Sequence, residues 1–389
     1  IQRFSMSLYL LDMTNSSTIF ANILAISILP QVLLAPIAGV LADRKNKKMI
    51  MLILDFISFF VLTIYAIIIY KNLDNYFIVA SVMVILSTCQ TIYQPAVTAS
   101  IPIIVKENKL VQANGLVQQV SSINNFLAPI LAGIVYGIFG IKIIIIINAI
   151  SFIISYAMEC FLDDLYSNSN ETGKINLKVF FKDMHSGYTY LSKKNKIIFK
   201  MILTSGLYNL FLVPIFSIIA PYIIKLELNM SSQTYGISEG IIAFGMIMGG
   251  FLITLNPKML GIKKIYYALY PNVVALFLAS IIFMGSFSNK IKLVTFVFAG
   301  FIIMFGLGIA NVISASYFQK VIPKDIFGKI ISISTAFAVI CVPLGQVLFG
   351  FALDIFKNHI WFVILISAFF TLLTTMVVRN NTFFIKEDI

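Results

Sequence analysis

Charged residues are scarce in this chain. Asp, Glu, Lys and Arg make up 11% of its 389 residues, whereas a soluble globular protein carries about 25%. Hydrophobic residues make up 59%, and the mean hydropathy is +0.96. This composition excludes an ordinary soluble fold and favours many packed helices in a bilayer.

Histidine and cysteine are also rare, which limits the chemistry open to the chain. The two histidines, His185 and His359, lie outside the apolar runs, and the three cysteines lie inside them without paired spacing. We interpret the cysteines as small core residues. No glycine-rich phosphate loop ending in Lys-Ser or Lys-Thr is present in the sequence. We therefore predict no enzyme activity, no ATP hydrolysis by this chain alone, no metal and no cofactor.

Long apolar runs alternate with short polar breaks along the sequence. Because a membrane helix needs about 20 apolar residues, the runs predict twelve transmembrane helices, of which the first lacks its start. The predicted spans are 1–11, 18–41, 48–70, 76–99, 115–138, 141–162, 198–224, 232–256, 264–286, 292–318, 328–353 and 360–378. They predict an all-α membrane protein with six-helix bundles at 1–162 and 198–380, a linker at 163–197 and a tail at 381–389.

Basic residues predict the orientation of the chain. One set of alternate loops, with the linker and the tail, holds 21 Lys and Arg residues, and the opposite loops hold six. Positively charged loops stay on the cytoplasmic side, so we expect both termini and the linker in the cytoplasm. The net charge of +12 is then mainly a topology signal, and a nucleic-acid partner is not expected. Within the linker, Lys178–Lys196 mixes apolar and charged residues as an amphipathic helix on the membrane surface does.

The two halves of the sequence echo each other. Lys106-Glu107 precedes one predicted helix, and Lys324-Asp325 precedes its counterpart. Each of these helices carries a mid-span proline near glycines, and for these positions we weigh a kink that shapes which side opens against ordinary close packing. The residues are Pro129, Gly133, Pro343 and Gly345. Internal repeats of this kind are typical of secondary transporters.

A dense charge cluster separates the second and third predicted helices. Its sequence is Gly39-x-Leu41-Ala42-Asp43-Arg44-x-x-Lys47-Lys48. This segment resembles the signature of the major facilitator superfamily. Asn46 departs from it, because the family often has glycine there. Ala128-Pro129-x-x-Ala132-Gly133, Gln94-Pro95-Ala96 and Gln319-x-x-x-Pro323 resemble segments of its drug:proton antiporters and macrolide-efflux-like exporters. The resemblance covers essentially the whole chain and implies the major facilitator fold.

The signature segment has two readings. Asp43 could face the N-terminal end of a later helix, whose free amide groups carry partial positive charge, and Arg44, Lys47 or Lys48 could pair with a carboxylate such as Asp55. Such contacts would form a conformational latch together with Gly39. The alternative is a simple anchor turn on the cytoplasmic side, which needs neither Gly39 nor Asp43.

Polar residues inside the predicted spans are candidates for a substrate cavity. Most are uncharged, which suits amphipathic organic compounds. They are Arg3, Gln90, Tyr93, Gln94, Gln118, Asn124, Asn125, Tyr208, Asn209, Asn311, Ser314 and Gln346. Glu239 lies about 10 Å into its helix and is the candidate for proton coupling, with a structural hydrogen bond as the alternative. The helix-four arginine of many proton antiporters is absent from this sequence.

The leading hypothesis is a secondary active exporter of amphipathic small molecules, of the drug or macrolide type, that works by alternating access and proton antiport. A lipid or siderophore-type exporter and an uncoupled facilitator remain open, as does a non-transporting membrane sensor or accessory subunit. We expect a monomer in a bacterial plasma membrane, with the substrate, protons and membrane lipid as partners.

Overall fold

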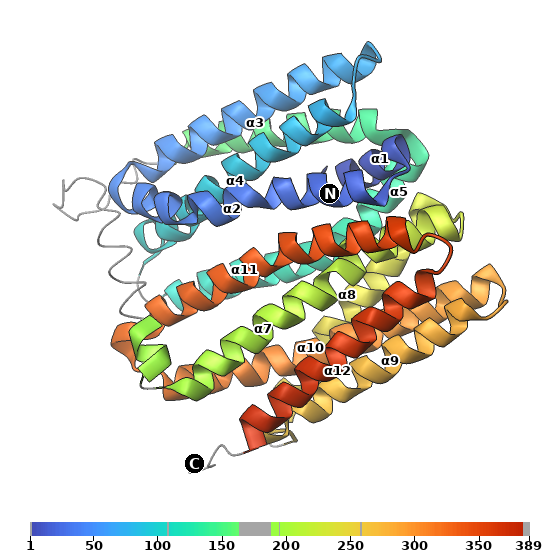
Figure 1. The fold of residues 1–389 in the computed structure, drawn as a ribbon. Helices are drawn as coiled ribbons and strands as arrows, with labels where there is room; N and C mark the ends of the chain where they lie inside the picture. The colour runs from blue at the N-terminus through green and yellow to red at the C-terminus, as the bar shows by residue number, and fades with distance from the viewer. Residues whose placement is uncertain (1, 107–108, 163–187, 194, 257–258, 384–389) are drawn as a thin grey trace. The chain divides into compact units, whose positions relative to one another are not determined.

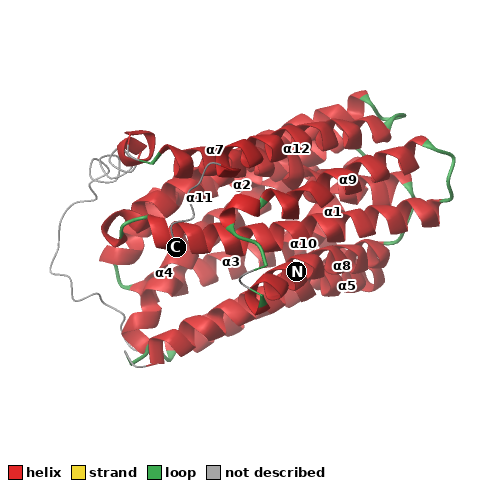
Figure 2. Cartoon of the chain, turned by 90° about the horizontal axis from the view of Figure 1, so that it is seen from below, coloured by secondary structure: helices red, strands yellow, loops and turns green. Residues whose placement is uncertain are grey.

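A computed structural model of the chain describes residues 2–106, 109–162, 188–193, 195–256 and 259–383. In these residues every regular element is a helix, and no strand occurs (Figure 2). Ten of the described helices are long and apolar enough to cross a membrane. The predicted all-α membrane class is therefore confirmed.

The helices form two compact units. Unit 1 comprises Ile1–Asn15 and Ile23–Phe180, and unit 2 comprises Ser16–Asn22 and Phe181–Ile389. The first turn of the second helix therefore groups with unit 2, while the rest of that helix groups with unit 1. Most of the predicted linker, including most of its amphipathic helix, falls outside the described residues, but 188–193 is helical.

The described residues of unit 1 form five helical elements, which Figure 1 labels. They are α1 (Gln2–Thr14), α2 (Ser17–Arg44), α3 (Lys47–Tyr70), α4 (Tyr76–Ile104) and α5 (Leu110–Cys160). α3 packs against α4 and α5, and α1 also packs against both. Leu8, Leu62, Tyr65 and Ile145 are completely buried, so large apolar side chains from several helices fill the centre of this unit.

Unit 2 contains six long helices. They are α7 (Lys196–Pro214), α8 (Ser232–Leu255), α9 (Tyr266–Met284), α10 (Asn289–Val321), α11 (Lys324–Ile355) and α12 (Ile360–Phe383). α10 packs against α8 and α9, α12 packs against α9 and α7, and α11 packs against α7. After α7 the chain continues in wider π-helical turns at Ile215–Ile219 and Tyr222–Glu227.

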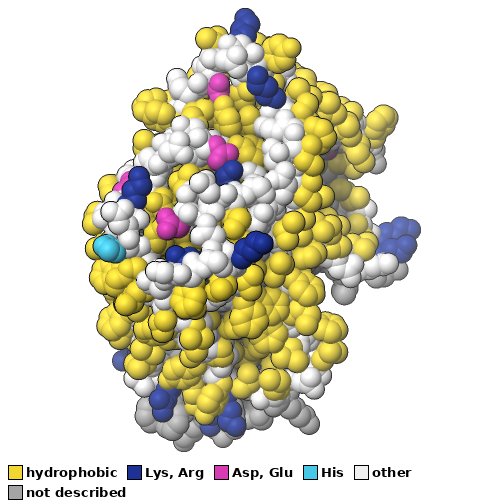
Figure 3. Space-filling model, turned by 90° about the vertical axis from the view of Figure 1, so that its right-hand side faces the viewer, with side chains coloured by type: hydrophobic (Ala, Val, Ile, Leu, Met, Phe, Trp, Pro, Cys, Tyr) yellow, Lys and Arg dark blue, Asp and Glu magenta, His cyan; other side chains and the backbone are white. Residues whose placement is uncertain are grey.

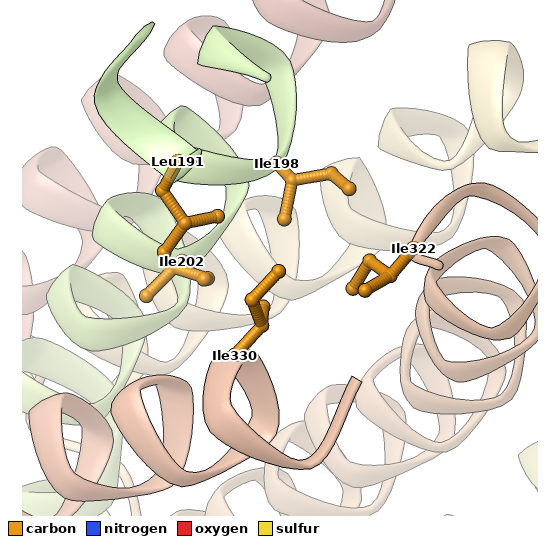
Figure 4. Packing of buried hydrophobic residues seen from close by; sticks show 5 residues of the cluster. All are labelled: Leu191, Ile198, Ile202, Ile322 and Ile330. Carbon is orange, nitrogen blue, oxygen red and sulfur yellow. The ribbon is translucent and has the colours of Figure 1, made fainter. Parts of the chain in front are cut away.

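One apolar cluster of unit 2 joins the ends of several helices. Leu191 from the helical stretch 188–193 packs with Ile198 and Ile202 of α7, Ile322 after α10 and Ile330 of α11 (Figure 4). None of the five is more than 3% exposed. Burying a side chain of this size stabilises the fold by about 1.5–3 kcal/mol, so the cluster fixes where these helix ends meet.

Glycines allow α8 and α10 to touch backbone to backbone. A Cβ atom built on Gly245 would lie 2.4 Å from the Phe301 carbonyl oxygen, and one on Gly249 would lie 2.0 Å from that of Phe305. From the other side, a Cβ on Gly308 would lie 2.3 Å from the Met246 carbonyl oxygen. We call these three glycines the glycine seam. Small residues at such spacing bring membrane helices together closely.

The sequence-based helix limits hold approximately, with one correction. The predicted helix 76–99 continues to Ile104, because hydropathy marks the apolar part of a helix and not its polar end. The predicted helices 115–138 and 141–162 meet at a kink inside α5, where the backbone leaves helical geometry at Gly140 with φ of 69°. That φ is open to glycine because it lacks a Cβ. Asparagine side chains cap several helix starts as expected for this residue, including Asn46 for α3 and Asn75 for α4.

Hydrophobic side chains cover much of the face shown in Figure 3, and charged side chains form only small groups on it. Phe77, Ile154 and Leu278 are each more than half exposed. Exposed apolar side chains along helices of this length are what a lipid-facing surface requires.

Candidate functional site

Unit 1 encloses a cavity of about 660 Å³ between α1, α2, α4 and the second half of α5. Of the predicted cavity residues, Arg3, Gln90 and Gln94 line it. The sequence reasoning missed several further polar lining residues, which are Gln2, Ser27, Gln31, Ser87 and Thr91. Gln90 donates a hydrogen bond from Nε2 to Gln94 Oε1 at 3.2 Å. The cavity is therefore rich in amide and hydroxyl groups.

Unit 2 encloses a second cavity, of about 300 Å³. Four predicted residues line it, namely Tyr208, Asn209, Asn311 and Ser314. Further polar lining comes from Thr204, Ser205, Asn381 and Thr382, and apolar lining includes Met201, Phe216 and Met246. Apolar walls with a few polar groups are typical of small-molecule sites.

Other predicted cavity residues lie elsewhere. Tyr93 donates from its hydroxyl to Glu159 Oε1 at 2.7 Å, and Gln346 donates to the Ser217 hydroxyl at 3.2 Å. Asn124 is exposed on α5. The side chains of Gln118 and Asn125 lie outside the described part of the chain.

Glu159 and Asp55 are buried carboxyl groups of unit 1, 7% and 3% exposed. Glu159 Oε2 and Asp55 Oδ2 have no hydrogen-bond partner within the described residues. Ser155, one turn before Glu159 on α5, is a side-chain neighbour of Asp55. Burying an ionised carboxylate whose oxygens are only partly hydrogen-bonded is costly, so these two groups are suited to holding a proton.

The charge cluster of the predicted latch is only partly described, because the side chains of Asp43 and Arg44 fall outside the described residues. Lys48 donates from Nζ to the Leu162 carbonyl at 2.5 Å. Lys47 is 2% exposed, and its Nζ has no hydrogen-bond partner within the described residues. Nothing lies within 4 Å of a Cβ built on Gly39. The predicted pairing of these cations with Asp55 stays a prediction.

Glu239 lies on α8, half-buried, and does not line either cavity. Its Oε1 is buried without a hydrogen-bond partner in the described part of the chain. The buried Tyr235, one turn earlier on the same helix, interacts with it electrostatically. The geometry is compatible with either of the two roles that the sequence left open.

The proline and glycine positions fall inside continuous helices. Pro343 and Gly345 are buried in α11, and a Cβ on Gly345 would lie 2.2 Å from the Leu210 carbonyl oxygen of α7. Gly133 is buried and Pro129 half-buried in α5. The backbone of α5 leaves helical geometry at Gly140 and stays helical at Pro129. Gly345 thus packs closely against α7.

The sequence reasoning also missed a polar contact of Asp354, near the end of α11. Its carboxylate accepts from the Ser17 hydroxyl at 2.5 Å and from the Thr18 backbone N–H at 3.1 Å. Ser17 and Thr18 form the first turn of α2, where backbone N–H groups lack helical partners. Asp354 therefore caps α2 from a different helix.

The spans, the fold and the two cavities can be compared with known proteins. The family model of the Major Facilitator Superfamily matches residues 2–345. The chain belongs to the Major Facilitator Superfamily. Macrolide efflux protein A of Streptococcus pyogenes is 26% identical over 366 residues, which cover 92% of this chain and 86% of that protein. Macrolide efflux protein A of Enterococcus faecalis is 26% identical over 337 residues, covering 84% and 99%.

Solved transporter structures share the fold of this superfamily member. A bacterial homologue of the iron transporter ferroportin in an inward-facing state superposes with a TM-score of 0.73 at 18% identity, covering 97% of this chain and 96% of that one. A D-xylose-proton symporter gives 0.72 at 11% identity, covering 97% and 92%. At these identities the likeness shows the fold alone. A transport function follows from the family.

Proposed function

We propose that this superfamily member is a secondary active exporter of amphipathic small molecules, working by alternating access. The observation that carries the proposal is the pair of cavities, each lined by apolar side chains and mostly uncharged polar groups. Such walls bind organic compounds by apolar contact and a few hydrogen bonds. The relatives named macrolide efflux protein A, aligned over most of the chain, support an export direction and a drug-type cargo.

We propose proton antiport as the energy source, with Glu239 as the coupling residue. A carboxyl group about 10 Å into a membrane helix is costly when ionised and unpaired. It can therefore take up a proton on one side of the membrane and release it on the other. The buried position of Glu239 Oε1 supports this role.

We further propose that Gly39, Asp43, Arg44, Lys47 and Lys48 form a conformational latch with Asp55, and that both termini are cytoplasmic. The buried Lys47 Nζ, which has no partner among the described residues, supports the latch, because an amine held in this way gains a partner if the surrounding contacts rearrange. The basic loops support the orientation.

A susceptibility and accumulation panel tests these proposals. The full chain is expressed in a pump-deficient bacterial host and challenged with macrolides, acidic dyes and cationic dyes, with and without a protonophore. We expect lower retention of at least one compound, restored by the protonophore and by Glu239→Gln or Asp43→Asn. Retention that falls but ignores the protonophore would indicate an uncoupled facilitator. Retention that never falls, together with no transport in proteoliposomes, would favour a non-transporting sensor or accessory subunit.

A further inference from the structure

Arg3 is the one charged residue among the fourteen that line the cavity of unit 1. Its side chain is exposed, and it forms no hydrogen bond or ion pair within the described residues. Its donors are therefore not engaged by any other described group of the protein. No Asp or Glu occurs among the described lining residues to neutralise it.

The position of Arg3 along α1 places its charge deep in the membrane-spanning part of the protein. Arg3 lies eleven positions before Thr14, at the end of α1, which corresponds to about 16 Å along the helix axis. That is about half of the ~30 Å hydrocarbon core of a bilayer. A charged side chain at this depth is costly and usually marks a substrate or ion pathway. Its exposure into a cavity with polar walls fits such a pathway.

The described carboxylates of unit 1 are occupied elsewhere. Three of them accept hydrogen bonds from tyrosine hydroxyls, and these pairs are Asp12 with Tyr136, Asp74 with Tyr9 and Glu159 with Tyr93. Asp55 is buried and does not line the cavity. Arg3 therefore keeps its full positive charge in the cavity, without an internal counter-ion among the described groups.

Amide groups surround this charge with further donors. Gln2, Gln31, Gln90 and Gln94 line the same cavity, and each amide has two N–H donors. A carboxylate next to Arg3 would accept charge-assisted, bidentate hydrogen bonds from the guanidinium. An amine cation would meet a like charge and no carboxylate.

The cavity of unit 2 adds no charge of either sign, because none of its nineteen lining residues is Asp, Glu, Lys, Arg or His. The fixed charge of the two described cavities is therefore positive and comes from Arg3. The apolar walls around it, with Met83, Leu86 and Phe152 in unit 1, suit the hydrophobic body of an amphipathic compound.

We propose that the exported compound is an amphipathic organic acid whose carboxylate binds Arg3. The proposal rests on the exporter function above and narrows its cargo to anions. Arg3 then selects substrates by charge, while the glutamines and the apolar walls bind the rest of the molecule.

Two xanthene dyes of opposite charge test the proposal. Carboxyfluorescein carries carboxylates, and rhodamine 6G is a cation with a similar fused ring system. The purified full chain is placed in proteoliposomes with an imposed pH gradient, and transport of each dye is measured. Binding of each dye to the protein in a neutral detergent is measured in parallel by fluorescence anisotropy.

The variants are Arg3→Gln, Arg3→Lys and Arg3→Glu, with Lys290→Gln as a control at an exposed helix start outside both cavities. We expect the unaltered chain to prefer carboxyfluorescein by at least about ten-fold. Arg3→Gln should lose this preference, Arg3→Lys should keep part of it, and Arg3→Glu should favour rhodamine 6G. Lys290→Gln should leave both dyes unchanged.

Two results would overturn the proposal: a preference for rhodamine 6G in the unaltered chain, or an equal loss of both dyes in Arg3→Gln. Failure of the exporter function has a different signature, in which neither dye is transported. In that case the anisotropy measurement tests the anion site alone. Binding of carboxyfluorescein that depends on Arg3 would support the site, and absence of such binding would contradict it.

Discussion

Asp354 caps a helix to which it does not belong, accepting a hydrogen bond from the Ser17 hydroxyl at 2.5 Å in the first turn of α2. Gly350, about one turn before Asp354 on α11, packs against the start of the same helix, because a Cβ built on Gly350 would lie 2.3 Å from Ala21 Cβ. This contact ties α11 to the only part of α2 that groups with unit 2.

Removing the acceptor should therefore destabilise the start of α2. We expect Asp354→Ala, which removes the carboxylate that accepts from both Ser17 and Thr18, to lower the free energy of unfolding by about 1 kcal/mol, the usual effect of a lost helix cap. The melting temperature of the purified chain in detergent measures it. Adding Ser17→Ala to this variant should cost little more, because the loss of the carboxylate already removes the hydrogen bond from Ser17. Full additivity would show that the two residues act separately.

The glycine seam predicts different effects for alanine at two neighbouring glycines of α8. Gly249→Ala should destabilise the protein by about 1–3 kcal/mol, as overpacking does, because the new Cβ would lie 2.0 Å from a backbone carbonyl oxygen. Gly250→Ala is the matched control, since its Cβ would meet only Val312 Cγ2, at 3.7 Å. Equal melting temperatures for the two variants would contradict the observed contact between α8 and α10.

The hydrogen bond from Tyr93 to Glu159 should stabilise unit 1. Tyr93→Phe leaves both oxygens of the buried Glu159 carboxyl without a described partner, and we expect a loss of about 1–3 kcal/mol. Combining it with Glu159→Gln gives the coupling energy in a double-mutant cycle. Tyr156→Phe serves as a control, because the Tyr156 ring contacts Phe56 in a tilted arrangement and its hydroxyl makes no hydrogen bond within the described residues. A similar loss in both tyrosine variants would indicate a packing effect.

A substitution of Lys47 should affect the stability of the protein and its transport activity differently. Replacing its buried, unpartnered amine by the apolar side chain in Lys47→Met should leave the melting temperature unchanged or raise it, because an unpaired buried charge is costly. If Lys47 belongs to the latch, transport by the same variant should fall. The exposed neighbour in Lys45→Met is the control for both readouts. A fall in stability with normal transport would make Lys47 a structural residue only.

The sequence predicts this fold well because every helix that crosses a bilayer needs a long run of apolar residues, which is visible in the sequence. An apolar run of about 20 residues has few other interpretations. The pattern is weaker at helix ends, since the predicted helix 76–99 continues to Ile104. The boundary between the predicted helices 115–138 and 141–162 agrees with the kink at Gly140.

Cavity residues are harder to predict, because hydropathy says that a polar side chain is unusual but not which way it points. Tyr93 and Gln94 are neighbours in sequence, yet successive residues on a helix turn by about 100°. Gln94 consequently lines the cavity while Tyr93 contacts Glu159. Ser27 could not be predicted as a cavity residue for another reason. Its hydroxyl donates a hydrogen bond to the Leu24 carbonyl of its own helix, and serines bonded in this way are common in membrane helices.

The glycine seam also restricts which amino-acid substitutions this protein can tolerate. At positions 245, 249 and 308 the first carbon of any side chain would overlap a carbonyl of the facing helix. Every amino acid except glycine carries that carbon. A mutation there would need a compensating shift of a whole helix, which no single second substitution provides. Hydrophobic positions facing lipid are free to exchange with one another, so we expect descendants of this sequence to diverge on their surface long before the three seam glycines change.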